Sequence, residues 1–300
     1  MEDLRPRQEL MDHFEKIYIH QDSWESIVAQ RVRRFFPPHK IETVSSSPLP
    51  EPGADHLSAL EFDRSKKLMF IKKFKGRFFK RCPGAKPGLT CCNYFILNTG
   101  LQCNMNCTYC YLQSFINSPL LTVYSNLDQA IEELQEFAKE QSEAKIRVGT
   151  GETVDSLSLD DLTLYSRSLI EFFRQVPHWR LELKTKSAQV DHFLDSEHGK
   201  NVIVSWSLNP QPIVAREELG TASLTERLQA ARKCRDRGYL VAFHIDPVIY
   251  HPEWKDNYSD LVNEICHYFE PHEVLNLSLG ALRFQPEQRH MMRERFGHRS

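Results

Sequence analysis

Three cysteines with close spacing are the residues of this chain best suited to chemistry. Cys103, Cys107 and Cys110 form the pattern C-x3-C-x2-C within the stretch NTGLQCNMNCTYCYLQ. Thiolates are soft ligands that bind zinc, copper(I) or iron–sulfur clusters. Structural zinc sites use four protein ligands, and ordinary ferredoxin clusters also use four cysteines. No second C-x2-C pair follows in the sequence, so three ligands with one open position favour a cluster. The alternative is a zinc site that takes Cys91 or Cys92 as its fourth ligand.

Composition indicates a globular intracellular protein. The chain has 300 residues, of which 41% are hydrophobic and 26% are charged, enough for one large α/β domain or two smaller ones. A net charge of −2 implies no general attraction to nucleic acid or membranes. The charged start lacks the apolar run of a signal peptide, and no stretch reaches membrane-spanning length. Eight cysteines in such a chain favour a reducing cytoplasm, where thiols are ligands or buried groups more often than disulfides.

Apolar strand-like segments alternate with amphipathic helical segments from Tyr94 onward. The predicted strands span residues 94–98, 146–149, 181–185, 202–207, 240–245 and 274–279. The predicted helices between them span residues 127–141, 160–174, 188–195, 223–237 and 257–269. This alternation favours a parallel sheet covered by helices, as either a barrel or an open doubly wound sheet.

Polar residues follow most of these strands, at the end where parallel α/β folds place their active sites. They include Thr150, Glu152, Lys186, Ser207 and Asn209. His244 and Asp246 follow the fifth strand two residues apart, so both point to the same face. They either orient a substrate or form a hydrogen-bonded pair in the core.

The region before residue 90 predicts a small α/β unit. Helices are expected at residues 6–16 and 22–36 and strands at 17–19 and 41–44, before a loop rich in Ser, Pro and Gly at 46–53.

A basic run follows this loop. Residues 64–86 contain ten Lys or Arg and no acidic residue, interleaved with Phe70, Phe74, Phe78 and Phe79. Such a run either binds nucleic acid, with cations on phosphates and aromatic rings on bases, or forms a solvated hairpin whose phenylalanines face the core.

The cysteine motif resembles that of a known superfamily. C-x3-C-x2-C with Tyr109 before the last cysteine is similar to the radical S-adenosylmethionine (SAM) enzymes, and the continuation through Tyr111 and Gln113 resembles the spore photoproduct lyase family. The resemblance covers roughly residues 15–290. It implies an α/β fold, a partial (β/α)6 TIM-like barrel at 91–285, with an N-terminal α/β extension carrying a basic hairpin at 1–90 and a tail at 286–300.

The resemblance also implies cofactors and roles. Cys103, Cys107 and Cys110 would bind a 4Fe–4S cluster, which a flavodoxin or ferredoxin would reduce so that SAM yields a 5′-deoxyadenosyl radical. The SAM contacts would be Thr150, Glu152, Lys186, Ser207 and Asn209, with Glu152 on the SAM amine. Tyr109 would shield the cluster, and Tyr111 would lie near the substrate and the radical path. The implied substrate is DNA with cross-linked thymines.

Two features depart from the family pattern. Glu152 stands where the family carries a hydrogen-donating cysteine, and the sequence does not include most of the family's C-terminal region, with a DNA-contacting hairpin, which is either missing or truncated. The first departure predicts that SAM is consumed as a co-substrate. Two other functions remain open. One is a radical SAM enzyme acting on a modified nucleotide, peptide or metabolite, and the other is a non-catalytic nucleic-acid-binding metalloprotein.

Overall fold

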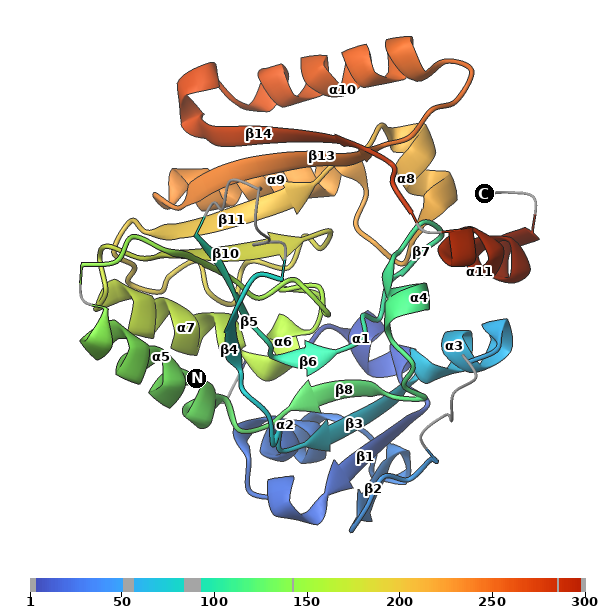
Figure 1. The fold of residues 1–300 in the computed structure, drawn as a ribbon, viewed down its shortest axis with the longest axis vertical. Coiled ribbons are helices and arrows are strands. Elements are labelled where there is room, and N and C mark those ends of the chain that lie inside the picture. The colour runs from blue at the N-terminus through green and yellow to red at the C-terminus, as the bar shows by residue number, and fades with distance from the viewer. Residues whose placement is uncertain (1–3, 51–56, 84–92, 142, 285, 298–300) are drawn as a thin grey trace.

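Two sheets form the framework of the molecule (Figure 1). The structure is a computed structural model, and it describes residues 4–50, 57–83, 93–141, 143–284 and 286–297. Cys91 and Cys92, the candidate fourth zinc ligands, lie outside these residues. No helix in the described ranges has the length and apolar character needed to cross a membrane.

The larger sheet is the predicted barrel sheet. Its strand order is β14-β13-β11-β10-β9-β5-β4. Six neighbouring strands are parallel: β5 (Tyr94–Leu97), β9 (Arg147–Gly149), β10 (Arg180–Thr185), β11 (Val202–Ser207), β13 (Leu240–Val248) and β14 (Val274–Ala281). Strand β4 (Phe79–Arg81) pairs antiparallel with β5 at one edge. The parallel strands follow chain order without the reversal that defines a doubly wound sheet. The predicted partial (β/α)6 architecture is therefore confirmed.

Helices cover the outer face of this sheet (Figure 1). They are α5 (Leu127–Glu140), α7 (Tyr165–Arg174), α9 (Leu224–Asp236) and α10 (Trp254–Tyr268). The short helix α6 (Asp160–Thr163) instead buries Leu162 in a second core with N-terminal residues, and α8 (Gln211–Glu217) contacts α10. The outward side chains of the strands form one hydrophobic core with α5, α7, α9 and α10, in which Trp179, Trp206 and Phe243 are almost fully buried. Since the outer faces are covered, the polar residues that end the strands remain available to a site.

The helix predicted at residues 188–195 is wrong. This segment forms turns in which Val190 and Phe193 are buried. The hydroxyl of Tyr239 donates to the carbonyl oxygen of Phe193 at 2.9 Å, outside any helical ladder. A single isolated turn of helix is marginal in water, so core packing and this hydrogen bond decide the local conformation.

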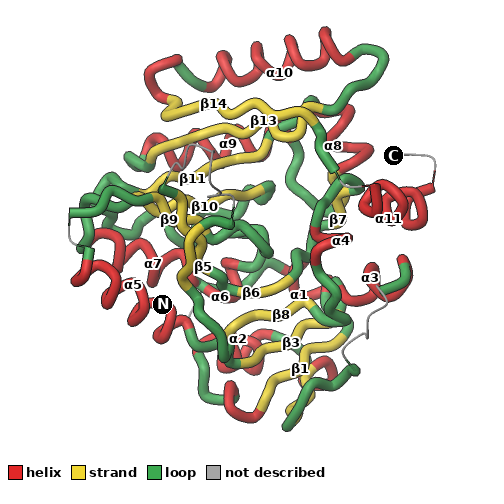
Figure 2. The backbone as a smooth tube through the Cα atoms, viewed as in Figure 1, coloured by secondary structure: helices red, strands yellow, loops and turns green. Residues whose placement is uncertain are grey.

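The smaller sheet has the order β2-β1-β3-β8-β6. Its strands are β1 (Lys16–His20), β2 (Ile41–Val44), β3 (Leu68–Lys72), β6 (Gly100–Leu101) and β8 (Leu121–Tyr124), and nearby helices are α1 (Gln8–His13), α2 (Ile27–Phe35) and α3 (Ala59–Ser65). Strands β6 and β8 come from beyond residue 90. The predicted boundary at that residue is therefore wrong, because the chain returns to the N-terminal sheet on both sides of the cysteines (Figure 2).

The predicted basic hairpin is also wrong. Strand β3 pairs with β1 and β8 in the smaller sheet, whereas β4 pairs with β5 in the larger one. The phenylalanines enter the core: Phe70, Phe78 and Phe79 are buried, and Phe74 stacks on Tyr124 with ring centroids 4.4 Å apart. Two larger sheets bury more apolar surface than an isolated two-stranded hairpin, which is marginally stable at best.

The predicted C-terminal tail contains a helix. Helix α11 (Pro286–Phe296) packs beside α3 and the short helix α4 (Leu112–Phe115), and its Met292 is buried against Cys107 and Tyr109. The end of the described chain therefore belongs to the surroundings of the cysteines.

Buried Arg31 joins the smaller sheet to the barrel. From α2 it donates Nε to the carbonyl oxygen of Leu162 at 2.7 Å and Nη2 to that of Asp161 at 2.9 Å. Arg31→Met should leave both carbonyl groups without this donor and lower the free energy of unfolding by about 2–4 kcal/mol, measured by urea denaturation. Arg64→Met, at an exposed position of α3, is the matched control. Equal losses for the two variants would show that Arg31 does not hold the sheets together.

Candidate active site

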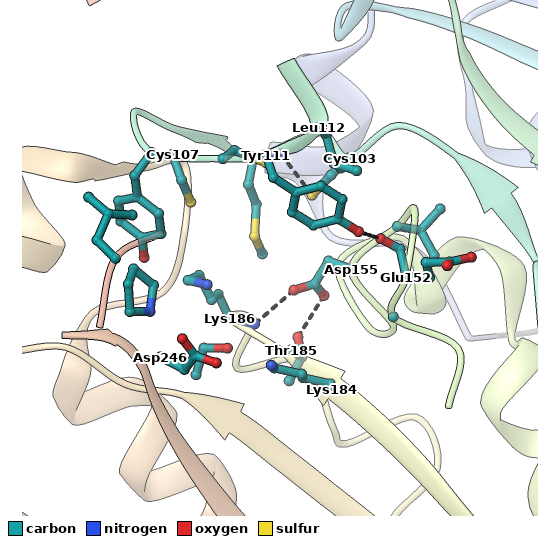
Figure 3. Close-up of a pocket in the computed structure, with 18 of the residues that line it drawn as sticks. Cys103, Cys107, Tyr111, Leu112, Glu152, Asp155, Lys184, Thr185, Lys186 and Asp246 are labelled. Atoms are coloured by element: carbon teal, nitrogen blue, oxygen red, sulfur yellow. Dashed lines mark hydrogen bonds between the residues drawn. The ribbon is translucent and has the colours of Figure 1, made fainter. Parts of the chain in front are cut away.

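The three cysteines lie on one loop between β6 and β8. The loop contains β7 (Asn106–Cys107) and α4. Cys107 is buried, and Cys103 and Cys110 are partly exposed. All three line a cavity of about 340 Å³ at the carboxyl ends of the barrel strands. Figure 3 shows Cys103 and Cys107 on one side of this cavity, with Lys186, Asp155 and Asp246 across from them.

A two-stranded sheet fixes the register of the cysteine loop. Strand β7 pairs antiparallel with β12 (Glu218–Leu219), with Cys107 opposite Glu218. Next to this pair, Thr108 donates its backbone N–H to the carbonyl oxygen of Glu217 at 2.8 Å and its hydroxyl to the Glu217 carboxylate at 2.6 Å. The loop has little regular secondary structure, so these contacts fix the position of Cys107 above the strand ends.

A buried charge network lies beneath the loop. The Glu218 carboxylate accepts hydrogen bonds from the Tyr109 hydroxyl and from Nδ2 of Asn209, the latter at 2.9 Å. Its other oxygen lies 2.6 Å from Nη1 of fully buried Arg227. Burial raises the pKa of Glu218, but Lys186 and Arg227 lower it more, so the carboxylate stays ionised.

Burial keeps the thiols of Cys103 and Cys107 protonated when no metal is bound. It raises the pKa of the Cys103 thiol to about 11 and raises that of Cys107 as well. No group of three or more His, Cys, Asp or Glu side chains within the described ranges is arranged to hold a metal ion. The cysteines in an iron–sulfur cluster bind separate irons, so thiols spread around one cavity suit a cluster.

The predicted residues divide into two groups. Those that line the cavity with the cysteines are Tyr109, Tyr111, Glu152, Lys186 and Ser207. Thr150 and Asn209 do not line it. The Thr150 hydroxyl donates to Ser156 at 2.8 Å, and the Asn209 side chain bonds to Glu218 and Tyr258. The latter two residues support the walls of the cavity.

Glu152 links the cavity to the edge of the barrel. Its carboxylate lies 2.9 Å from Nζ of Lys80 on β4, and its carbonyl oxygen accepts a hydrogen bond from the Tyr111 hydroxyl (Figure 3). Gly149, shortly before it, is required because a Cβ there would lie 1.7 Å from the hydroxyl oxygen of Tyr94. Tyr111 is 46% exposed, at the cavity mouth.

His244 and Asp246 lie in different environments. Nε2 of His244 lies 3.2 Å from the Glu182 carboxylate inside the barrel, where Ser205 also donates to Glu182 at 2.7 Å. Burial raises the pKa of Glu182, but its bonds with His244 and Ser205 and the charge of Arg147 bring it down to about 2. The prediction of a hydrogen-bonded His244–Asp246 pair is therefore wrong. His244 pairs with Glu182, and Asp246 lines the cavity.

Sequence reasoning missed several residues of the site. Asp155 accepts the Lys186 N–H at 2.7 Å and the Thr185 hydroxyl at 2.6 Å, which fixes the end of β10. Gln288 of α11 donates to the carbonyl oxygen of Tyr109 at 3.1 Å. Lys184 and Arg283, which the sequence places among the polar residues at the strand ends, also line the cavity. Asp155 lies close enough to Glu152 in sequence to have been found as an acid after β9, whereas Gln288 has no local signal.

Comparisons with known proteins agree with this geometry. The family model for spore photoproduct lyase matches residues 61–299. The chain is 32% identical over 197 residues to spore photoproduct lyase of Geobacillus sp. (strain Y412MC61), covering 65% of this chain and 58% of the relative. It is 27% identical over 215 residues to that of Bacillus subtilis (strain 168), covering 71% and 60%. The matches thus span less than two thirds of these curated relatives.

Solved structures of the same kind share the fold. A spore photoproduct lyase variant with bound AdoMet and dinucleoside spore photoproduct matches with a TM-score of 0.81 and 25% identity, covering 94% of this chain and 83% of the other. A complex of spore photoproduct lyase with dinucleoside spore photoproduct matches with a TM-score of 0.80 and 24% identity, with the same coverage. Since the family model extends over most of the sequence, from α3 through α11, this chain belongs to the spore photoproduct lyase family.

Proposed function

We propose that this chain is a radical SAM enzyme that repairs cross-linked thymines in DNA. The observation that carries the proposal is the cavity in which three thiols face lysine, carboxylate and hydroxyl groups from the strand ends. The similar structure with AdoMet and dinucleoside spore photoproduct supports the ligand classes. The described cysteines are free, which suits the reducing cytoplasm where such a cluster survives.

The cysteine loop fits a 4Fe–4S cluster on Cys103, Cys107 and Cys110. A cluster held by thiolates would add negative charge, which buried Lys66 and partly buried Lys186 would offset. Nζ of Lys66 donates to the carbonyl oxygens of Cys103 and Met105 at 2.8 and 2.7 Å. Burial lowers the pKa of Lys186, but neighbouring groups, Glu218 first among them, raise it more, so Lys186 stays charged beside the loop.

The remaining walls fit SAM. Lys186 and Lys184 would hold its carboxylate, Ser207 would offer a hydroxyl, and Glu152, paired with Lys80 in this structure, would hold its amine. Thr150 and Asn209 hold these walls from behind. Together, a reduced cluster and SAM supply the one-electron chemistry that removes a hydrogen atom from a substrate carbon. A flavodoxin or ferredoxin would provide the electron.

The two tyrosines have separate tasks in this proposal. Tyr109 is buried and its hydroxyl is bonded to Glu218, so it holds the loop and excludes water. Tyr111 lies at the mouth, where a substrate enters. Burial, with Cys110 and Glu152 nearby, raises the pKa of Tyr111, so its phenol keeps its proton at neutral pH. Tyr111 is therefore the tyrosine placed to meet the substrate.

The cluster ligands are tested by substitution. Anaerobically reconstituted protein should bind about four irons and four sulfides per chain, and Cys103→Ala, Cys107→Ala or Cys110→Ala should abolish this uptake. Iron and sulfide analysis with visible absorption measures it. Cys266→Ala is the matched control, because Cys266 is exposed and lies on α10. Stoichiometric zinc without iron uptake would contradict the cluster.

The ammonium of Lys66 provides a second test. Lys66→Met should speed iron loss to a chelator and lower the free energy of unfolding by about 2–4 kcal/mol, since two loop carbonyls lose a charged donor. Lys145→Met removes an equal charge from an exposed site far along the chain and should change neither quantity. Iron retention equal to wild type would limit Lys66 to a role in folding.

The reaction itself is tested with dinucleoside spore photoproduct, dithionite and SAM. We expect slow conversion or aberrant products, with about one 5′-deoxyadenosine formed per lesion. A carboxylate at position 152 cannot return a hydrogen atom as the weak S–H bond of cysteine does, so the thymine radical has to be quenched by an electron from dithionite and a proton from water. Glu152→Cys should lower the SAM consumed per lesion, whereas the control Glu152→Ser should not. Product analysis by liquid chromatography measures both ratios. Clean conversion by wild type with SAM fully recovered would refute the consumption of SAM, and no conversion at all would refute the repair function.

A further inference from the structure

The cations of the basic run have different surroundings. Lys66 is buried under the cysteine loop, and Lys80 pairs with Glu152. Lys73, Lys75 and Arg77 are exposed in the segment that crosses from β3 to β4, and they make no ion pair with any residue in the described part of the chain (Figure 1). We call these three residues the basic rim.

The basic rim stands on a fixed turn. Asn126 accepts the Phe74 N–H at 2.8 Å and donates to the Phe74 carbonyl oxygen at 3.0 Å. The Glu133 carboxylate accepts the N–H groups of Phe78 and Phe79 at 3.1 and 2.9 Å. This acid packs against the segment, but its oxygens are bonded to backbone amides and not to the rim cations. The cations therefore project from an ordered backbone and remain open to an external anion.

The rim lies at the active-site end of the barrel. The backbone N–H of Asn98, just after β5, donates to the Phe78 carbonyl oxygen at 2.9 Å, so the segment meets the carboxyl end of β5. Lys80 reaches Glu152 from the same segment, and Glu152 lines the cavity. A polymer whose damaged unit enters the cavity would thus extend past the rim.

We propose that Lys73, Lys75 and Arg77 bind the sugar–phosphate backbone of DNA beside the lesion, an assignment that rests on the proposed function for its ligand. Three unpaired cations suit closely spaced phosphates, and each contact releases counterions from the DNA. The neighbouring phenylalanines are packed in the core, so no exposed ring of this segment stacks on bases. The rim therefore positions DNA without reading its sequence.

The test is the salt dependence of duplex binding. Wild-type protein and the variant Lys73→Gln/Lys75→Gln/Arg77→Gln bind a labelled 20-base-pair duplex without a lesion, and fluorescence anisotropy gives the dissociation constant across a salt series. Each lost phosphate contact lowers the slope of log K against log salt by about 0.9, so the variant should lose about 2–3 units. An undamaged duplex makes this readout independent of the repair chemistry.

Matched controls separate charge from position. Lys145→Gln/Arg180→Gln/Lys200→Gln removes the same charge from exposed positions near the starts of β9, β10 and β11, at the opposite end of the barrel, and should keep the wild-type slope. Conversion of dinucleoside spore photoproduct, which lacks flanking phosphates, should be unchanged in the rim variant. If both triple variants showed the same salt-dependence slope, the proposal that the basic rim binds phosphates would be wrong, whatever the result with the dinucleoside. Polyglutamate of equal charge competing as well as DNA would overturn its assignment to nucleic acid. If the wild-type protein did not convert the dinucleoside at all, that result would instead count against the repair function.

Discussion

The carboxylate of Glu218, buried beneath the cysteine loop, is the group on which the arrangement of the site depends. A buried charge is stable only when its partners stay in place, and its partners here belong to separate parts of the chain. Tyr109 comes from the loop, Asn209 follows β11, and Arg227 lies in the first turn of α9. Arg227 also donates to the carbonyl oxygen of Ser207 at 2.9 Å. One ionised group thus holds the loop at a set height over the strand ends and gives the cavity its depth.

The barrel could be predicted because its signals are local. Strand β11 is buried along its whole length and opens with the apolar run Val202–Val204, and helices such as α5 and α7 carry an apolar stripe. Sheet membership could not be predicted in the same way. The sequence MFIKKFKGRFFKR has the alternation of apolar and polar residues expected of a hairpin. In the structure, however, β3 pairs with β8 and β4 pairs with β5. Those pairings depend on strands far along the chain. A local sequence pattern carries no information on which distant strand a segment pairs with.

The candidate site shows the same division between local and distant information. Cys103, Lys186 and Ser207 could be placed because short motifs and strand ends mark them. Gln288, Lys66 and the Lys80–Glu152 pair could not, since each brings together segments with no shared pattern. The phenylalanines of the basic run were ambiguous for a physical reason: a ring between lysines suits both a base and a core. Burial resolves that choice, and it leaves phosphate binding to the cations alone.

The pairing of β6 with β8 has a consequence for the order of events during synthesis. These strands are antiparallel neighbours, with Gly100 opposite Val123, so the cysteine loop is closed at its base as soon as residue 124 is available. Most of the barrel and α11 are still to be made at that point. At about 5–20 residues per second, the ribosome needs on the order of 10–30 s more to reach α11. During the first part of that interval the three thiols lie on one short closed loop whose partner strand β12 and covering helix α11 have not been made, so they are more accessible than in the finished protein.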